Sequence, residues 1–502
     1  MTVHRHAVAL AVFASSLCIA SQSHAAIFKV GAGGYPTIAA ALDAVAYQST
    51  LSSSPNELRI AAGSYEGSPA SRTISVPLAV SGGWNADFTM QSADPTLTRV
   101  SGAYAHSAMG YWVFTSGGSS ISNLTVESGY LSTCASSGAG AAFALRGSAR
   151  LTVSKVSFSK NMIYGGTGAF GPCYGAGLWV YATDTSKITL QAVTFEGNAD
   201  YAGTPDGSGL WLLANGQAYA SMQGIRSTGN WASTTSNSYA GASVALFAIG
   251  ANSLIEFSNG QFTNNASYGG TGGGGISNLE AQAESGSMIW LDRLSVTGGY
   301  STGAFVHPMS VSPPVSMPHT SVALNALNTG LVRLRNSVVS GSNGLGLGVI
   351  AADSGVVQLD NLTVADHRAA GLVNWSASSN PVQIANSIFA GNGLGVVSSD
   401  YTPADPGTTR YPGWLQQNVV LMGSRWDWSN LNNPARYATF ADPDHGNYHL
   451  PGASPARNHG NNAPSIDLGV ADLDGNARVQ ESTVDIGAYE YPVFSFIPVY
   501  PF

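Results

Sequence analysis

The sequence predicts an all-β protein in which short parallel strands stack into a solenoid, and three observations support this prediction. The chain has 502 residues and 60 glycines, yet only 10% of its residues are charged. Ordinary soluble domains have about 25% charged residues and about 7% glycine. Because glycine, serine, threonine and asparagine form helices poorly, long helical architectures fit this composition badly. The third observation is an apolar pattern of period two that recurs along the chain.

That pattern has apolar residues at relative positions 0, 2, 5 and 7, followed by a turn signal at position 10. It is clearest at Leu151, Val153, Val156 and Phe158. Each copy is typical of two short strands around a corner, with one apolar face that only stacked copies can bury. Strands of successive coils would pair in parallel roughly 4.8 Å apart. The copies start at residues 119, 151, 188, 220, 255, 289, 332, 357 and 382.

Asparagine recurs at two fixed places of this repeat. Asparagine and glycine tolerate the left-handed conformation that sharp corners need, and stacked amides can hydrogen-bond from coil to coil. We therefore expect a structural role for these asparagines rather than a role in ligand binding. They are Asn123, Asn259, Asn336, Asn361 and Asn386 at position 4, and Asn161, Asn198, Asn230, Asn265 and Asn392 at position 10.

Composition and charge exclude several functional classes. A hydrophobic content of 44% and a net charge of −8 argue against disorder. The chain has 4 lysines, no basic run and a pI near 5.6, so no nucleic-acid partner is expected. The glycines have no period of three, which excludes a collagen triple helix.

Residues 1–25 have the features of a secretory signal peptide. A basic start precedes an apolar run from Ala7 to Ala20, and small residues flank the expected cleavage site at Ala25. No later stretch reaches the roughly 18 apolar residues that a membrane-spanning helix needs. We therefore expect a secreted or cell-surface protein without a transmembrane helix.

Stretches near both ends of the mature chain point to a family. Residues 30–45 (VGAGGYPTIAAALDAV), 58–66 (LRIAAGSYE) and 81–88 (SGGWNADF) resemble the start of right-handed parallel β-helix proteins of the pectin-lyase-like superfamily. In that family a short helix caps the solenoid, and Thr37 would cap this helix. The C-terminal stretches resemble the choice-of-anchor Q module, which ends exported solenoids. They are NYHL at 447–450, SPA at 454–456, DLDGN at 472–476 and VDIGAYE at 484–490.

The expected organisation follows from the repeat and this resemblance. A single right-handed parallel β-helix fills most of the chain, between a short N-terminal capping helix and a C-terminal module. The boundaries are a signal peptide at 1–25, the cap and first coils at 26–100, and the helix repeats at 101–400. A loop-rich insertion at 401–440, the anchor-Q-like module at 441–490 and an apolar tail at 491–502 follow.

The resemblance predicts the fold and leaves two classes of function. The superfamily includes lyases, hydrolases and adhesins, so fold alone does not give activity. One class is an exported protein that binds polysaccharide or envelope glycans along the side of the solenoid without catalysis. The alternative is a polysaccharide lyase or glycoside hydrolase that acts on an acidic polysaccharide. The binding class is favoured because no complete catalytic signature is present, and the oligomeric state stays open.

Charged residues at one register position form the first candidate site. Asp292, Arg335 and Asp360 hold the same position in neighbouring coils, and Asp366 and His367 follow the strand of Asp360. As a catalytic cluster, this row would bind an acidic sugar, with Arg335 as base or clamp. The structural alternative is a ladder of salt bridges on the surface, in which each pair contributes about 0–1 kcal/mol to the stability of the fold.

A second pair of acids, Glu127 and Glu196, lies two coils apart with Lys160 between them. Two strand spacings are about 9.6 Å, near the upper end of the carboxylate separation in inverting glycosidases. One of the two acids would need a raised pKa, and nothing in the sequence indicates the burial that would raise it.

Tyrosines recur in the loops and form a candidate binding row. Tyr164, Tyr201, Tyr239 and Tyr268 stand beside glycine or alanine in successive coils, and such a row would offer flat faces to sugar rings. The alternative is a ladder that packs the loops together.

Two further features concern cross-links and metals. Cys134 and Cys173 lie in successive loops of the tyrosine region, where an oxidising compartment favours a disulfide between them. Asp472 and Asp474 in DLDGN resemble part of a calcium loop but lack its downstream glutamate, and an aspartate-capped turn explains them equally well. No cofactor other than calcium is suggested.

Overall fold

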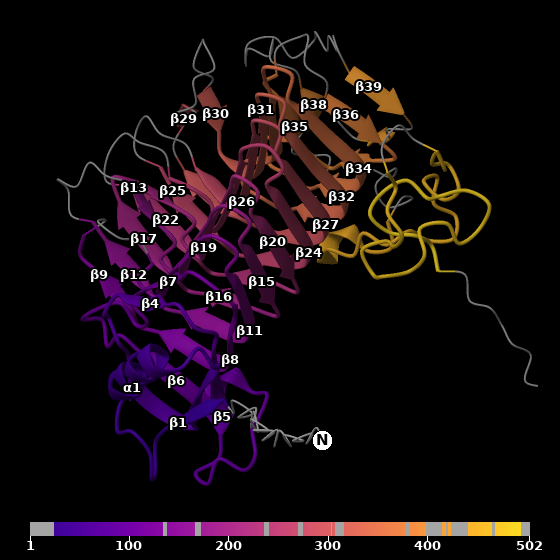
Figure 1. Cartoon of the computed structure of the whole chain (residues 1–502). Coiled ribbons are helices and arrows are strands. Elements are labelled where there is room, and N and C mark those ends of the chain that lie inside the picture. The colour runs from indigo at the N-terminus through magenta and orange to yellow at the C-terminus, as the bar shows by residue number, and fades with distance from the viewer. Residues whose placement is uncertain are drawn as a thin grey trace, which may run out of the picture.

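The computed structural model of the chain describes residues 25–133, 138–165, 172–234, 240–269, 275–302, 304–306, 316–376, 382–397, 414–417, 420–422, 440–463 and 467–492. It is an all-β, right-handed parallel β-helix, as the sequence predicts, with helix α1 (Ile38–Leu51) at its N-terminal end (Figure 1). The expected signal peptide and apolar tail lie almost wholly outside the described residues.

Three parallel sheets form the sides of the solenoid, and the successive coils contribute strands to them in turn. The largest has 19 strands: β1 (Ala26–Val30), β2 (Asn56–Ala61), β3 (Gly63–Glu66), β5 (Leu78–Trp84), β6 (Thr98–Ser101), β8 (Gly118–Glu127), β11 (Arg150–Ser159), β15 (Lys187–Gln191), β16 (Thr194–Glu196), β20 (Tyr219–Gln223), β21 (Arg226–Thr228), β24 (Leu254–Thr263), β27 (Met288–Thr297), β32 (Leu331–Ser340), β34 (Val356–Ala365), β36 (Val382–Ala385), β37 (Ile388–Ala390), β39 (Trp414–Gln417) and β40 (Val420–Met422).

The other two parallel sheets are smaller. The 11-stranded sheet holds β4 (Arg72–Ile74), β7 (Tyr111–Phe114), β10 (Ala141–Leu145), β14 (Leu178–Ala182), β19 (Leu210–Asn215), β23 (Val244–Ile249), β26 (Ile276–Glu284), β31 (Thr320–Leu327), β33 (Leu345–Ala351), β35 (Ala370–Asn374) and β38 (Leu394–Val397). The six-stranded sheet holds β9 (Tyr130–Leu131), β12 (Met162–Tyr164), β17 (Ala199–Ala202), β22 (Trp231–Thr234), β25 (Ala266–Tyr268) and β28 (Tyr300–Thr302).

The remaining elements are short. β13 (Pro172–Tyr174) pairs with β18 (Thr204–Asp206) in parallel, and β29 (Ala304–Val306) pairs with β30 (Ser316–Pro318) antiparallel. Two 3-10 turns, η1 (Pro95–Leu97) and η3 (Pro443–His445), complete the described elements. Within 401–440, where we expect a loop-rich insertion, β39 and β40 continue the 19-stranded sheet beside β36 and β37.

The repeat sets the register of the core. Leu151 pairs with Ile188 and Phe158 with Phe195, and the apolar residues of the repeat are buried. The rings of Phe158 and Phe195 stack with centroids 5.5 Å apart, so side chains as well as strands repeat from coil to coil. At the N-terminal end the hydroxyl of Thr37 accepts a hydrogen bond from the backbone N–H of Ala40, which confirms it as the cap of α1.

The asparagines have the structural roles that their positions predict. The corner asparagines adopt left-handed backbone, with φ of 55° at Asn123 and 50° at Asn336. At position 10 the amides form a buried ladder. Asn161 Nδ2 donates to Asn198 Oδ1 at 3.0 Å, and Asn198 Nδ2 donates to Asn230 Oδ1 at 2.8 Å. Each amide also contacts backbone of a neighbouring coil, so the ladder joins the coils along the inside of the corner.

Residues 440–463 and 467–492, here called the C-terminal segment, pack against the outer side of the last coils (Figure 1, yellow). This segment contains the stretches that resemble the choice-of-anchor Q module. One apolar cluster joins the two parts: Val338, Ala365, Ile388 and Ala390 from the solenoid contact Phe440, Tyr448, Leu450, Ala456, Ile486 and Ala488 from the segment.

Candidate functional site

The structure brings Asp292, Arg335 and Asp360 into one row on the 19-stranded sheet. Arg335 pairs in register with Asp292 on β27 and with Asp360 on β34. Its Nε lies 3.1 Å from Asp292 Oδ1, and Arg293 Nε lies 3.2 Å from the other oxygen of the same carboxylate. Neighbouring coils therefore place these groups side by side, and what the row can do depends on what covers it.

An acidic residue of the C-terminal segment engages the basic end of the row. The carboxylate of Asp467 lies 2.7 Å from Arg335 Nη1 and 3.5 Å from Arg333 Nη1. The Asp467 side chain is 64% exposed, whereas those of Arg335 and Asp292 are each 20% exposed. A carboxylate thus already occupies the side of Arg335 that faces away from Asp292.

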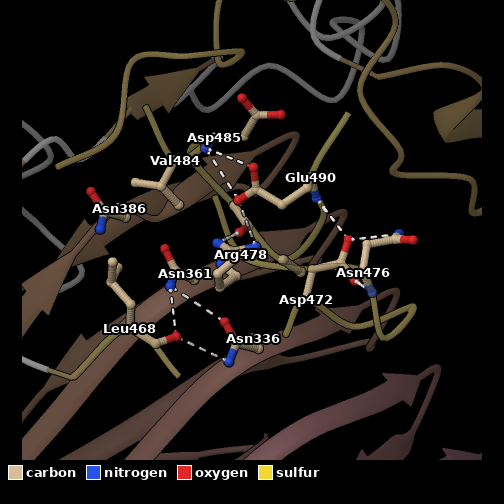
Figure 2. Close-up of polar contacts among 12 residues, drawn as sticks. Asn336, Asn361, Asn386, Leu468, Asp472, Asn476, Arg478, Val484, Asp485 and Glu490 are labelled. Atoms are coloured by element: carbon tan, nitrogen blue, oxygen red, sulfur yellow. Dashed lines mark hydrogen bonds and ion pairs between the residues drawn. The ribbon is translucent and has the colours of Figure 1, made fainter. Parts of the chain in front are cut away.

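The backbone of the C-terminal segment covers the corner asparagines beside the row (Figure 2). The carbonyl oxygen of Leu468 accepts hydrogen bonds from Nδ2 of Asn336 and Asn361, at 3.3 and 3.4 Å. Asn386 Oδ1 accepts from the N–H of Asn461 at 2.8 Å. Asp360 is fully buried under this contact. A polysaccharide would reach Asp360 only if the C-terminal segment moved away.

Asp366 and His367 are also engaged within the protein. The hydroxyl of Tyr448, from the C-terminal segment, donates to Asp366 Oδ2 at 2.6 Å. His367 is buried between Ser342 Oγ, 2.8 Å from its Nδ1, and the carbonyl oxygen of Val339, 2.9 Å from its Nε2. Burial lowers the pKa of His367 to about 4, so its imidazole is neutral near pH 7. The catalytic role predicted for this pair would require both residues to become accessible.

A buried arginine is the centre of the docked C-terminal segment (Figure 2). Arg478 is 2% exposed; its Nη1 lies 3.2 Å from Glu490 Oε1, and its Nη2 donates to the carbonyl oxygen of Gly487 at 2.7 Å. Its charge also acts on Asp360 and Asp485. One guanidinium thus compensates carboxylates from both the solenoid and the segment.

Sequence reasoning misses Arg478, although one signal for the contact is present. On the outer side of the 19-stranded sheet, one register position is polar in the earlier coils and apolar in two of the last three, at Val338 and Ile388. A position that is polar along the exposed part of a solenoid and apolar at one end indicates a covered surface. The position holds Ser157, Thr194, Arg226, Gln261 and Ser295 in earlier coils, then Val338, Thr363 and Ile388.

The docked contact should be sensitive to pH between about 4 and 8. Burial raises the pKa of Asp360 to about 7 and that of Glu490 to about 8. Exposed carboxyls titrate near pH 4, so the docked state binds these two protons more tightly than the undocked state. Docking is therefore strongest below about pH 4, where both groups are protonated in either state. It weakens as pH rises, until the groups also ionise in the docked state near pH 7 and 8. Asp467 does not contribute in this range, because its pKa is lowered by hydrogen bonding to Gly469 and by Arg335.

Hydrogen exchange over residues 440–492, corrected for its intrinsic pH dependence, measures this effect. We expect protection to fall between about pH 4 and 8 and to level off above pH 8, and the double variant Asp360→Asn, Glu490→Gln to show a flatter profile. Protection that stays constant across this range in the unmodified chain would contradict the predicted linkage.

Asp472 and Asp474, predicted as a weak calcium site, make hydrogen bonds typical of a capped turn. Asp472 Oδ1 accepts from the N–H of Asn476 at 2.7 Å, and its Oδ2 accepts from the N–H of Glu490 at 2.9 Å. Asp474 contacts His449 Nε2 at 2.6 Å. Within the described part of the chain, no group of three or more His, Cys, Asp or Glu side chains is arranged to hold a metal ion.

The second acid pair lies two strands apart in one register row of the 19-stranded sheet. Glu127 and Glu196 pair in register with Ser159 on β11, which lies between them. Glu127 faces Arg99 at 3.6 Å, and Lys160 occupies a left-handed corner with φ of 54°. The catalytic role of this pair stays a prediction.

The tyrosines lie on the outer side of the six-stranded sheet and belong to a longer row of rings. Ring centroids of Tyr164 and Tyr201 are 5.8 Å apart, and Tyr201 lies 4.3 Å from Trp231. Trp231 lies 6.3 Å from Tyr268, and Tyr268 lies 5.8 Å from Tyr300. We call these five residues, from β12, β17, β22, β25 and β28, the aromatic strip. Tyr239 lies outside the described residues.

Exposure distinguishes this strip from the ring stack of the core. Tyr164 is 51% exposed, Tyr268 39% and Tyr300 49%, while Tyr201 and Trp231 are half-buried between them. Sequence reasoning misses Trp231 and Tyr300 because they stand directly after the position-10 residue, whereas the predicted tyrosines stand three residues after it. The two offsets belong to alternate positions of one short strand, which point to the same side.

Cys173 is fully buried in β13, and Cys134 lies outside the described residues. The disulfide between them stays a prediction. No helix among the described residues is long and apolar enough to cross a membrane.

Comparisons with known proteins find similarity at the level of the fold. No family model matches the chain, and no curated protein matches it. Similar solved structures include the pectate lyase Pel9A, 12% identical over 94% of this chain and 97% of its own, with a TM-score of 0.46. The catalytic domain of a GH87 α-1,3-glucanase is 11% identical over 78% of this chain and 68% of its own (TM-score 0.42). The periplasmic alginate epimerase AlgG is 11% identical over 78% and 84% (TM-score 0.37). Similarities this distant say nothing about activity.

Proposed function

We propose that this chain is an exported parallel β-helix protein that binds polysaccharide along the aromatic strip, without catalysing its cleavage. The observation that carries the proposal is the continuous, exposed row from Tyr164 to Tyr300 across five neighbouring coils. Five coils span four strand spacings, or about 19 Å along the solenoid axis. A row of this length suits an extended polymer better than a single small sugar.

The chemistry of the strip supports the same proposal. Aromatic rings offer flat apolar surfaces to the C–H faces of sugars, and the tyrosine hydroxyls add polar groups that can hydrogen-bond to sugar hydroxyls. In the core the phenylalanine rings stack inside the solenoid, where they stabilise the fold. The strip lies outside, so its exposed rings stabilise little unless something covers them.

The alternative is a lyase or hydrolase that acts on an acidic polysaccharide through Asp292, Arg335, Asp360, Asp366 and His367. Two observations favour binding over this alternative. Asp360 and His367 are buried, and Asp467 already faces Arg335. Incubation with polygalacturonate and alginate, monitored for unsaturated products and reducing ends, distinguishes the two. Reproducible turnover that is lost on Arg335→Ala would favour the enzyme.

The proposal includes three finer points that come from the sequence. Residues 1–25 direct export, the C-terminal segment is a choice-of-anchor Q type module that ends the exported solenoid, and Cys134 bonds to Cys173 in the oxidising compartment. A disulfide at this place would hold two loops beside the strip, because Cys173 lies in the strand that follows the loop after Tyr164.

Binding to immobilised polysaccharides tests the main proposal. We expect Tyr164→Ala, Trp231→Ala and Tyr300→Ala each to weaken retention about fivefold to thirtyfold, since each removes about 1–2 kcal/mol of ring contact. Tyr47→Ala is the matched control, because Tyr47 is 68% exposed on α1 and lies far from the strip. Retention that is the same in all four variants, or absent for every polysaccharide, would contradict the proposal.

A further inference from the structure

The aromatic strip lies on a surface with very few charges. Among the described residues of the six-stranded sheet, Asp200 on β17 is the one acidic or basic residue, and it is fully buried. Burial raises the pKa of Asp200 well above its usual value. The raised pKa favours the uncharged form of this carboxyl beneath the rings.

The flank of the strip toward the 19-stranded sheet is equally poor in cations. The basic residues nearest to it in sequence are Lys160, at the corner before β12, and Arg226 on β21. Lys160 shares its coil with Arg150 and Lys155 on β11, whereas Arg226 has no basic residue beside it in β20 or β21. The row in register that borders the strip carries two carboxylates and otherwise hydroxyls. Its members are Glu127, Ser159, Glu196, Thr228, Thr263 and Thr297.

A polymer with one carboxylate on each sugar needs several cations along its path. Without them it loses the hydration of its charges and gains no charge-assisted hydrogen bonds in return. Glu196 would also repel it within a Debye length of roughly 8–10 Å, whereas Arg99, 3.6 Å from Glu127, offsets the charge of that second carboxylate. Uncharged sugars need only what this surface offers, which is flat rings and hydroxyl partners.

We infer that the aromatic strip selects an uncharged polysaccharide, such as a glucan or a mannan, over an acidic one. This inference rests on the proposed function and specifies the ligand of the same site. The rings supply the contact, and the threonine hydroxyls of the bordering row supply hydrogen bonds. The arginines that could hold an acidic sugar, Arg333 and Arg335, lie on another sheet and face Asp467.

Affinity electrophoresis of the full chain tests this selectivity. The gels contain mixed-linkage β-glucan, mannan, polygalacturonate or alginate, and each is run at low and at high salt. We expect retardation by at least one neutral polymer. That retardation should be lost in Trp231→Ala, kept in Tyr47→Ala and independent of salt, and the acidic polymers should bind at least tenfold more weakly.

A gain-of-charge variant provides the second test. The double variant Thr263→Lys, Thr297→Lys places two cations in neighbouring coils beside the strip. We expect it to gain salt-sensitive retardation by alginate or polygalacturonate while Trp231 still contributes.

The outcomes separate the two proposals. Equal or stronger binding to an acidic polymer, lost in Trp231→Ala and weakened by salt, would overturn the selectivity and keep the strip as a binding site. Binding to none of the four polymers would overturn both proposals.

Discussion

Replacing Arg478 by alanine should release the C-terminal segment from the solenoid. The guanidinium is 2% exposed and is the cation that faces Glu490 and acts on Asp360. Above about pH 8, where Asp360 and Glu490 are both ionised, its loss leaves carboxylates from two parts of the chain buried with no compensating charge. Removing one partner of a buried ion pair destabilises by about 3–5 kcal/mol, which is comparable to the whole stability of a small docked unit.

Limited proteolysis and hydrogen exchange of residues 440–492 measure this release. We expect the segment to become cleavable while the strands of the solenoid keep their protection. Arg99→Ala is the matched control, because the 50% exposed Arg99 pairs with Glu127 at 3.6 Å, outside the segment, and exposed pairs contribute little. Adding Asp360→Asn to Arg478→Ala should restore part of the docking, since it removes one buried charge. A segment that is equally protected with and without Arg478 would contradict the role assigned to it.

Replacing Asn198 by alanine should produce the second large effect, a loss of stability of about 3 kcal/mol. The amide of Asn198 accepts from the N–H of Asn161 at 3.1 Å and donates to the carbonyl oxygen of Phe158 at 2.9 Å. It is also the middle member of the ladder from Asn161 to Asn230. The variant would leave buried polar groups without these partners, and each such group costs about 1–3 kcal/mol.

The midpoint of urea unfolding measures this loss. Gln223→Ala serves as the matched control, because Gln223 is the last residue of β20 in the 19-stranded sheet and its side chain is exposed. Asn198→Ser should recover a small part of the loss, since a hydroxyl is too short to bridge two coils. If Asn198→Ala unfolds at the same midpoint as Gln223→Ala, the ladder does not stabilise the stack.

Periodicity explains what could be predicted from the sequence. The apolar pattern predicts the strands, the corner and the buried face, because each coil packs against a coil of similar sequence. It is clearest at Leu151, Val153, Val156 and Phe158. The position-10 asparagines follow from the same rule. The row of Asp292, Arg335 and Asp360 was also predictable as a geometric feature, because equal positions in neighbouring coils become neighbours in space.

Contacts outside the repeat could not be predicted in this way. Arg478 belongs to no coil, and its neighbour Asp360 lies more than a hundred residues earlier in the chain. Periodicity can indicate that the last coils have a covered face, as Val338 and Ile388 do, but it does not identify the residues that cover the charged row. Trp231 was not predicted for a different reason. It lies on the same outer side as the tyrosines, but it stands one residue after the position-10 asparagine, and the predicted tyrosines stand three residues after it.

The site where the C-terminal segment docks also bears on how the solenoid ends. In a linear array the terminal coils have a neighbour on one side only, so they are the first to fray. Hydrogen bonds from the segment reach Asn336, Asn361 and Asn386, which belong to three successive coils. The segment therefore connects these three coils, because a coil that separates from the stack must first break its hydrogen bonds to the segment. It holds these three coils together from the side, one coil before β39 and β40.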